Sequence, residues 1–320
     1  MTTNSNDTIL SVIDPDLGQR LISRREAVAK ASFSGVVGAG MALGSVPVAL
    51  AALSRNAFGQ STPAAITDVL NFALMLEIFE NEFYKAVLGT STSTAQNTAF
   101  TTARAAAAAV PGAVAALQQI QKHEQQHVAF LLANGATNVL NLTATSFDFT
   151  GNRSTAGGGP FAAAGTNLPF LLAVAQGAED TGVRAYKGQA GTLQSNPMVL
   201  EAALRIHAVE ARHAAKIRRM RRATGAPNQV RFAGYIQGTG ITAAGISNLT
   251  NVPAAVTATF EAIYAGDGST THGGVNVARL PNIPSDIDLT SASTMAFDEP
   301  LTKAAVIAIV QPFFIPAIPA

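Results

Sequence analysis

The chain has 320 residues, 48% hydrophobic and 13% charged, and this composition excludes a chain that is disordered throughout. Lys and Arg number 21 against 20 Asp and Glu, so the formal net charge of +1 provides no overall field that would attract nucleic acid. The sequence contains no cysteine, which excludes disulfides, thiolate catalysis, zinc knuckles and iron–sulfur clusters and leaves Glu, Asp and His as candidate metal ligands.

Residues 1–59 have the pattern of an export signal. The pair Arg24-Arg25 precedes a charge-free stretch over residues 31–53, and a second small-residue segment ends at Gly59. This pattern resembles a twin-arginine signal, although Ala27 stands where a Phe is common and Lys30 falls one place late. We therefore expect export to the periplasm or the cell exterior. The alternatives are an uncleaved membrane anchor, since about 20 apolar residues can span a bilayer, and an ordinary buried helix.

The first half of the mature chain predicts two long helices. Apolar residues recur at helical spacing from Ile66 to Leu88, and Thr67 or Asp68 is placed to cap the start. A Thr/Ser/Asn stretch and an alanine-rich run follow, and a second helix is predicted over residues 113–132. Residues 135–166 are rich in Asn, Thr and Gly, which indicates a long connection that could cross the length of a bundle.

Two more helices complete the predicted bundle. The third begins near Asn167 and runs to about Tyr186, and the fourth begins near Asn196 and runs to about Arg222. Two short connections and one long connection favour an all-α, four-helix bundle over residues 60–223. Residues 224–320 contain possible short helices around 254–264 and 301–310 and too many apolar residues to leave in water, so we expect an extension packed on the bundle.

Possible metal ligands repeat on the second and fourth helices. Each contains a Glu-x-x-His pair, Glu124 with His127 and Glu210 with His213. Three residues turn an α-helix by about 300° and advance it by about 4.5 Å, so each Glu and His share a face and can bind one ion. One such pair arises often by accident on an amphipathic helix. Two copies, each following a helix with its own glutamate, predict a shared site.

The first and third helices carry the other half of the repeat. Glu77 stands seven residues before Tyr84, and Glu179 stands seven residues before Tyr186, so about two turns return each tyrosine to the face of its glutamate. The two tyrosines are candidates for hydrogen bonds to the ligands or for redox-active phenols, and the alternative is a pair of core tyrosines with satisfied hydroxyls.

The predicted ligands of a dinuclear metal site are Glu77, Glu124, His127, Glu179, Glu210 and His213. Four carboxylates gathered between helices repel one another unless they take up protons or cations. Two divalent ions neutralise four carboxylates, and two trivalent ions leave an excess positive charge that favours anionic oxygen species. The ligands suit two iron ions, two manganese ions or one of each.

The chain resembles the ferritin-like proteins that include bacterial and plant desiccation-related proteins. The resemblance rests on Leu70–Glu77 running into Phe83-Tyr84, Glu179–Tyr186, Val209–Ala215, Phe297–Pro300 and Pro312–Phe314. It covers residues 64–225 well and the C-terminal extension loosely. The resemblance implies the fold and a site for iron or manganese, whereas it leaves the reaction open.

Three classes of function fit this sequence. The first is an oxidoreductase, manganese catalase-like or ferroxidase-like, that consumes dioxygen or hydrogen peroxide and protects the cell envelope under oxidative or drying stress. The second is an envelope store or scavenger of iron, and the third is a structural stress protein. We expect small-molecule partners, no nucleic acid and no membrane contact for the mature domain, and the sequence is compatible with a homodimer.

Several other polar residues have weaker functional interpretations. Glu80 could replace Glu77 as a ligand or join it, and His207 could reach the edge of the site. His123 and His272 are expected to be structural or surface residues. A cluster of basic residues ends the fourth helix, where cations favour the helix dipole and are expected to face solvent. These residues are Lys216, Arg218, Arg219, Arg221 and Arg222.

Overall fold

The computed structural model describes residues 63–154, 158–224, 252–272, 274–280, 289 and 298–319. All of these belong to one compact unit, Val46–Ala320. The predicted export signal lies outside the described residues. Among the residues that are described, no helix combines the length and apolar character needed to cross a membrane.

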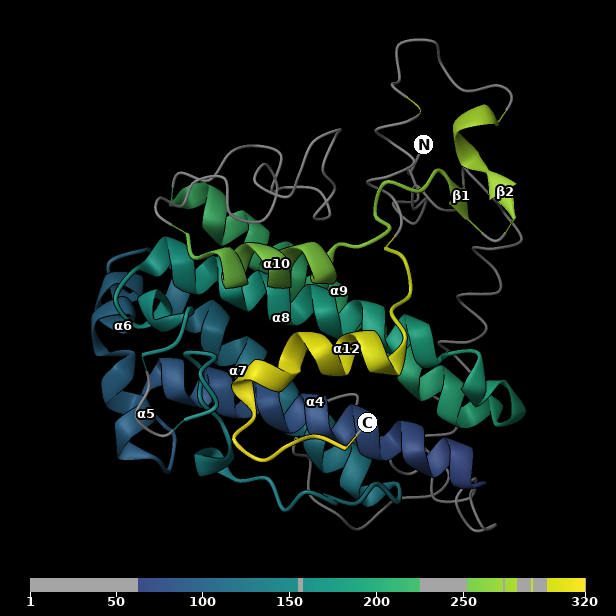
Figure 1. Cartoon of the computed structure of the whole chain (residues 1–320), viewed down its shortest axis with the longest axis horizontal. Helices are drawn as coiled ribbons and strands as arrows, with labels where there is room; N and C mark the ends of the chain where they lie inside the picture. The colour runs from purple at the N-terminus through teal and green to yellow at the C-terminus, as the bar shows by residue number, and fades with distance from the viewer. Residues whose placement is uncertain are drawn as a thin grey trace, which may run out of the picture. The chain divides into compact units, whose positions relative to one another are not determined.

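The centre of the molecule is a bundle of long helices (Figure 1). Helix α4 (Ala64–Leu88) packs along α7 (Ala113–Ala133), and α8 (Leu168–Gln189) packs along α9 (Pro197–Ala223). Two short helices, α5 (Thr94–Ala99) and α6 (Thr101–Ala108), lie between α4 and α7 in the chain, and η3 (Thr192–Ser195) lies between α8 and α9. The predicted all-α bundle is confirmed, with helix boundaries within three residues of those expected.

The starts of the bundle helices follow local signals. The side chains of Asn167 and Asn196 accept hydrogen bonds from the backbone N–H groups of Phe170 and Val199, and each helix has a proline in its first turn. Helix α4 behaves differently. It begins directly after Pro63 with no side-chain cap, so Thr67 and Asp68 lie inside the helix and the predicted cap is wrong. Proline supplies a suitable φ at this boundary without a capping side chain.

The connection between α7 and α8 is the predicted long crossover, with the short helices η1 (Ala144–Ser146) and η2 (Ala162–Gly165). Its aromatic residues anchor it to the bundle. The Phe147 ring lies 5.8 Å from that of Phe79 on α4, and Phe147 forms a backbone bridge with Phe314 near the C-terminus. Aromatic packing therefore joins the crossover, helix α4 and the end of the chain.

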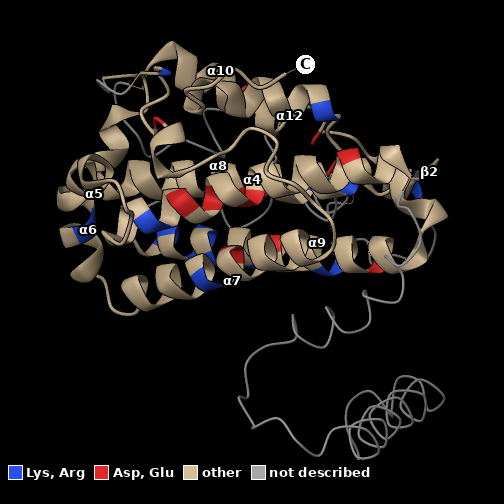
Figure 2. Cartoon of the chain, turned by 90° about the horizontal axis from the view of Figure 1, so that it is seen from below, with Lys and Arg blue, Asp and Glu red and all other residues tan. Residues whose placement is uncertain are grey.

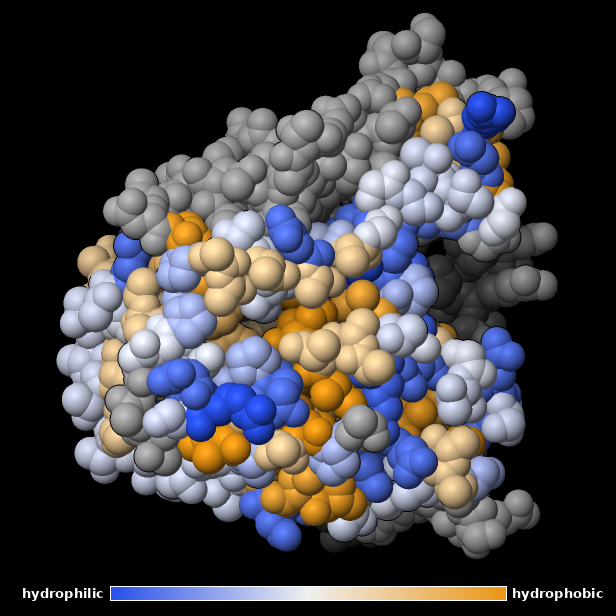
Figure 3. Space-filling model, viewed as in Figure 1, coloured by the Kyte–Doolittle hydropathy of each residue, from blue (hydrophilic) through white to orange (hydrophobic). Residues whose placement is uncertain are grey.

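The described parts of the C-terminal extension comprise α10 (Ala254–Ile263), the antiparallel pair β1 (Thr271–His272) and β2 (Val275–Asn276), η5 (Val277–Arg279), α12 (Lys303–Val310) and η6 (Gln311–Phe313). Its two α-helices pack on the bundle as predicted. Both α10 and α12 contact α8. Val256 and Phe260 of α10 and Val306 and Ile309 of α12 are buried. Figure 3 shows apolar surface in the region where α12 crosses in front of the bundle.

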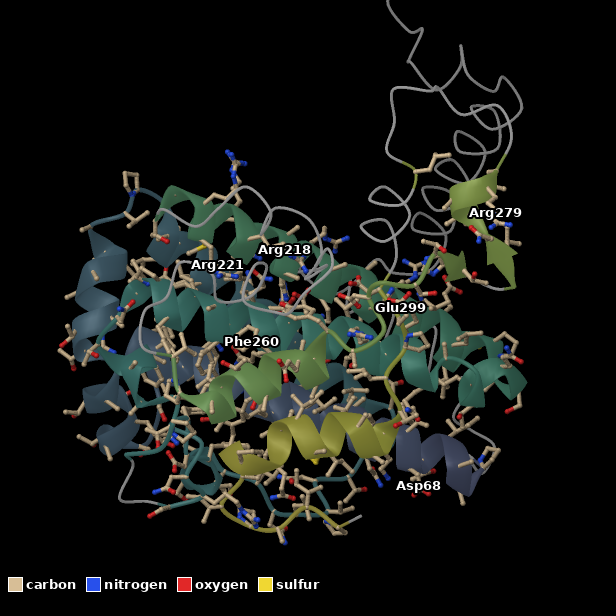
Figure 4. The ribbon with its side chains drawn as sticks, turned by 45° about the horizontal axis from the view of Figure 1, so that its top comes forward. Asp68, Arg218, Arg221, Phe260, Arg279 and Glu299 are labelled. Carbon is tan, nitrogen blue, oxygen red and sulfur yellow. The ribbon has the colours of Figure 1, made fainter. Side chains whose placement is uncertain are left out.

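The basic residues at the end of α9 fall into two sets. Lys216, Arg219 and Arg222 are exposed as expected. Arg218 and Arg221 are buried, so the expectation that they face solvent is wrong (Figure 4). Arg218 pairs with Asp180 of α8, and Arg221 donates a hydrogen bond to Gln176 at 2.7 Å. Tyr264, at the end of α10, donates to Asp180 at 2.7 Å. The extension therefore covers charged groups that would otherwise meet water.

A third buried arginine links the extension to α8. Arg184 donates to the carbonyl oxygens of Ile263, Ala265 and Glu299, and its guanidinium lies 3.1 Å from Asp267. One turn further along the helix, a Cβ at Gly188 would lie 1.9 Å from the Leu301 carbonyl oxygen. Only glycine allows this close approach of the two backbones.

Candidate metal centre

The structure brings all six predicted ligands together in the interior of the bundle. Each of the four long helices supplies one glutamate, and α7 and α9 also supply one histidine each. All six side chains are buried. Figure 2 shows acidic positions, drawn in red, in the middle stretches of the bundle helices. Helical spacing explains this arrangement, because Glu-x-x-His turns both groups toward the same side of the helix.

The first group of converging donors surrounds His127. Its Nδ1 atom lies 3.0 Å from Glu77 Oε2, 3.1 Å from Glu124 Oε2 and 3.1 Å from Glu210 Oε1. Ligand atoms of these four residues all lie within 4.8 Å of one another. A single ring N–H cannot donate well to three oxygens at once, so this geometry suits a cation at their centre.

The second group repeats the first around His213. The Nδ1 atom of His213 lies 2.9 Å from Glu124 Oε1, 3.1 Å from Glu179 Oε2 and 3.4 Å from Glu210 Oε2. The donor atoms of these residues also lie within 4.8 Å of one another. The structure thus contains two sets of donors of the same composition, three carboxylates and one imidazole.

Two of the carboxylates are shared between the groups. Glu124 presents Oε2 to His127 and Oε1 to His213, and Glu210 presents Oε1 to His127 and Oε2 to His213. Glu77 belongs to the first group alone and Glu179 to the second alone. Two shared and two unshared carboxylates are an arrangement that could hold two adjacent ions.

Each tyrosine contacts the glutamate of the opposite helix. Tyr84 of α4 donates to Glu179 of α8, and Tyr186 of α8 donates to Glu77 of α4. The seven-residue spacing predicted the correct helix face, but it could not show this exchange of partners. Burial, and then the charge of the accepting glutamate, raises the pKa of both phenols well above the usual value, so each keeps the proton that it donates.

The pKa values of the four glutamates shift in two directions. Burial raises the pKa of Glu77 to about 8 and that of Glu179 well above its ordinary value. Burial acts in the same direction on Glu124 and Glu210, but the neighbouring histidines outweigh it and lower both pKa values. Without metal, protons on the histidines supply the positive charge that the two shared carboxylates need.

The shared carboxylate oxygens have few partners besides the histidines, which supports a cation at this place. Glu124 Oε1 and both carboxylate oxygens of Glu210 are buried, and within the described part of the chain they contact histidine nitrogens at 2.9–3.4 Å but receive no hydrogen bond of good geometry. An unpaired buried carboxylate oxygen is costly, and a bound divalent ion removes that cost. The donor set of carboxylates and imidazoles suits iron or manganese. The residues present therefore fit a pair of such ions.

Glu80 lies beside the site, outside the two donor groups. It is buried, and both burial and the charges of Glu210, Glu179, Glu124 and Glu77 raise its pKa well above the ordinary value. A Cβ at Gly182 would lie 3.3 Å from Glu80 Oε1 and 3.5 Å from Glu210 Cγ, so glycine leaves room next to these side chains. The structure thus places Glu80 as a fifth carboxyl group next to the four glutamates.

A family model described as a ferritin-like domain matches residues 65–223. This part of the chain is a ferritin-like domain. It contains all six predicted ligands and both tyrosines, whereas the extension lies beyond it. Comparisons with curated proteins and with solved structures gave no match.

Of the remaining histidines, His123 and His207 lie within the ferritin-like domain and His272 lies beyond it. His207 Nδ1 lies 2.9 Å from the Val183 carbonyl oxygen, which links α9 to α8. His272 is in the extension, 3.6 Å from Glu299. His123 is half-buried, and its Nδ1 lies 2.8 Å from Nε2 of His213. From the sequence, His123 is expected to be a structural or surface residue. Its position directly before Glu124 is the signal that could have placed it near the site.

Proposed function

We propose that this chain is an exported metalloprotein whose ferritin-like domain binds two iron ions, two manganese ions or one of each, and reacts with dioxygen or hydrogen peroxide. The observation that carries the proposal is the sharing of Glu124 and Glu210 between two donor groups of equal composition. Shared carboxylates would hold two ions close enough to act on one small molecule.

The chemistry of such a pair is a two-electron exchange, as in 2 H2O2 → O2 + 2 H2O or 2 Fe²⁺ + O2 + 2 H⁺ → 2 Fe³⁺ + H2O2. The chain's own groups have separate parts in it. Glu77 and Glu179 close the two ends of the site, and the tyrosine hydroxyls hold their protons and orient these carboxylates. The chain has no cysteine to carry electrons inward, which suits a reaction that completes its cycle at the site.

The test is metal analysis and turnover of the full chain purified from its native cell. We expect two ions per chain, together with peroxide-dependent oxygen release or oxidation of added ferrous iron. Metal-replete protein that does neither is not an oxidoreductase of this class. Tight binding of two ions without turnover indicates a metal store or scavenger instead.

We further propose that residues 1–59 are a twin-arginine signal, 60–223 the bundle and 224–320 its extension, in an envelope protein of the desiccation-related group. The support is the Arg24-Arg25 pair before a charge-free stretch. Replacing both by lysine should abolish export, because a receptor reads the pair, and should leave the melting temperature of the folded chain unchanged. Normal export of the double variant rules out the twin-arginine signal.

A further inference from the structure

The two ring nitrogens of His213 face opposite ways. Nδ1 points at Glu124, Glu179 and Glu210, at 2.9–3.4 Å, and Nε2 lies 2.8 Å from Nδ1 of His123. An imidazole that binds a metal through one nitrogen carries its proton on the other. Metal binding through Nδ1 therefore makes His213 Nε2 the donor and His123 Nδ1 the acceptor.

The geometry of the two rings suits that hydrogen bond. Their planes are 13° apart and their centroids are 5.1 Å apart. Nearly parallel rings whose nitrogens lie 2.8 Å apart let the N–H of one ring point at the in-plane lone pair of the other. The partner thus fixes both the tautomer and the orientation of His213.

His123 is itself held from the surface side. Its Nε2 lies 2.6 Å from the amide nitrogen, Nε2, of the exposed Gln119, one turn earlier on α7. With Nδ1 accepting from His213, His123 carries its proton on Nε2 and donates it to the amide oxygen, which a turn of the amide group presents. The contacts therefore run from the exposed Gln119 through His123 to the buried His213.

This contact breaks the internal repeat of the bundle. Glu124 and Glu210 occupy matching positions in the two Glu-x-x-His pairs, and the residues before them are His123 and Val209. Valine has no polar side-chain atom, so the His127 group has no counterpart to the imidazole partner at this position. The two donor groups are thus unequal around their histidines.

We propose that His123 is a positioning residue for the second donor group and holds His213 Nδ1 toward Glu124, Glu179 and Glu210. This inference rests on the proposed dinuclear site. Removing a hydrogen-bond partner of a ligating histidine lowers metal affinity by about 10–100-fold. Because His127 has a different environment, the loss should affect one ion of the pair and spare the other.

The test is a titration of the full metal-free chain with Co²⁺, followed by calorimetry and by the visible absorption of the bound ion. In H123L we expect binding of one ion to weaken by about 10–100-fold, with a changed absorption band, and binding of the other to stay as in the wild type. H123N returns an acceptor near the Nδ1 position and should recover most of the affinity. H207L is the matched control, because His207 is also half-buried and lies one turn from a ligand.

Three results would overturn the assignment. H123L could bind both ions as the wild type does, or H123L and H123N could lose both ions equally, which indicates a packing role. The third concerns the wild type: ¹⁵N NMR of the Zn²⁺-loaded chain should show the His213 proton on Nε2, and a proton on Nδ1 contradicts the proposal. Wild-type protein that binds no metal defeats the dinuclear function itself, which is a separate outcome.

Discussion

Glu124 and Glu179 carry the same carboxylate, yet the structure gives them unequal positions. Glu124 contacts both histidines, whereas Glu179 contacts His213 and receives a hydrogen bond from Tyr84. A bridging carboxylate contributes to two ions and a terminal one to a single ion. Removing one charge at each position should therefore have different consequences.

The first prediction concerns metal stoichiometry. E124Q keeps the size of the side chain but weakens both donor groups, so we expect it to retain almost no metal after dialysis. E179Q should keep the ion of the His127 group and lose the other. Elemental analysis against protein concentration measures both values. H272A is the control and should bind metal as the wild type does, because His272 lies in the extension, outside both donor groups.

Equal metal loss in all three variants would show that these side chains act through folding rather than through ligation. Circular dichroism of the metal-free forms separates the two explanations.

Sequence spacing predicted which residues enter the site but not how they share it. The Glu-x-x-His pairs fix a helix face, and that face is enough to gather the six side chains. The exchange of tyrosine partners, the fifth carboxyl group of Glu80 and the contact of His123 with His213 depend on how helices lie against one another. A period along one helix does not contain that information.

Helix α8 separates two polar environments. Glu179 faces the proposed metal site, and the next residue, Asp180, faces the extension, where it pairs with Arg218 and accepts from Tyr264. Both carboxylates are almost completely buried. Charge compensation on the extension side therefore contributes to the stability of the bundle.

The second prediction compares a buried ion pair with an exposed one. R218M leaves the Asp180 carboxylate buried without its cation and should lower the free energy of unfolding by roughly 3–5 kcal/mol. Adding D180N to R218M should recover most of that loss, because the carboxylate that R218M leaves without its arginine is then neutral. R205M is the control. Arg205 pairs at 2.6 Å with Glu201, both side chains are more than half exposed, and its loss should cost less than about 1 kcal/mol.

Urea unfolding of the metal-free variants measures these differences. A similar loss in R218M and R205M would contradict the distinction, and so would a double variant no more stable than R218M alone.

Local signals predicted the helices better than they predicted burial. Asn167 and Asn196 each precede a proline, and both cap their helices where expected. The burial of Arg218 and Arg221 could not be predicted from α9, because the side chains that surround them include Tyr264, more than 40 residues further along the chain. Solvation of a charge depends on what the rest of the chain covers.

The third prediction concerns the pH dependence of stability in the metal-free protein. Several buried groups have a folded-state pKa above their unfolded value: Glu77, Glu80, Glu179, His127 and His213. Such groups bind more protons in the folded chain than in the unfolded chain. The folded state therefore loses the stability that they contribute as pH rises toward the folded pKa. The melting temperature without metal should therefore rise as pH falls from about 8 to about 5.

Two groups set the acid limit of this trend. Glu124 and Glu210 have lowered pKa values, so the stability they contribute is present above about pH 4.5 and is lost as they take up protons. With metal bound, all of the ligating carboxylates stay ionised, and the rise should flatten or reverse as acid competes for the ligands. Thermal melts with and without chelator measure both profiles. Parallel profiles would mean that these glutamates do not act together.

Glu179 and Asp180 are adjacent in α8 but face different surroundings, so the rotation of α8 about its own axis must be fixed. One residue turns an α-helix by about 100°, so a slip of one position would aim Asp180 at the proposed metal site and turn Glu179 about 100° away from it. Gln176, Asp180 and Arg184 are spaced four apart on the extension side of α8. Their contacts with Tyr264, Arg218 and Asp267 would be broken by this slip, so they hold the rotation of α8 in place. Residues 65–223 contain the proposed ligands, and contacts with the segment beyond them fix which carboxylate of α8 faces inward.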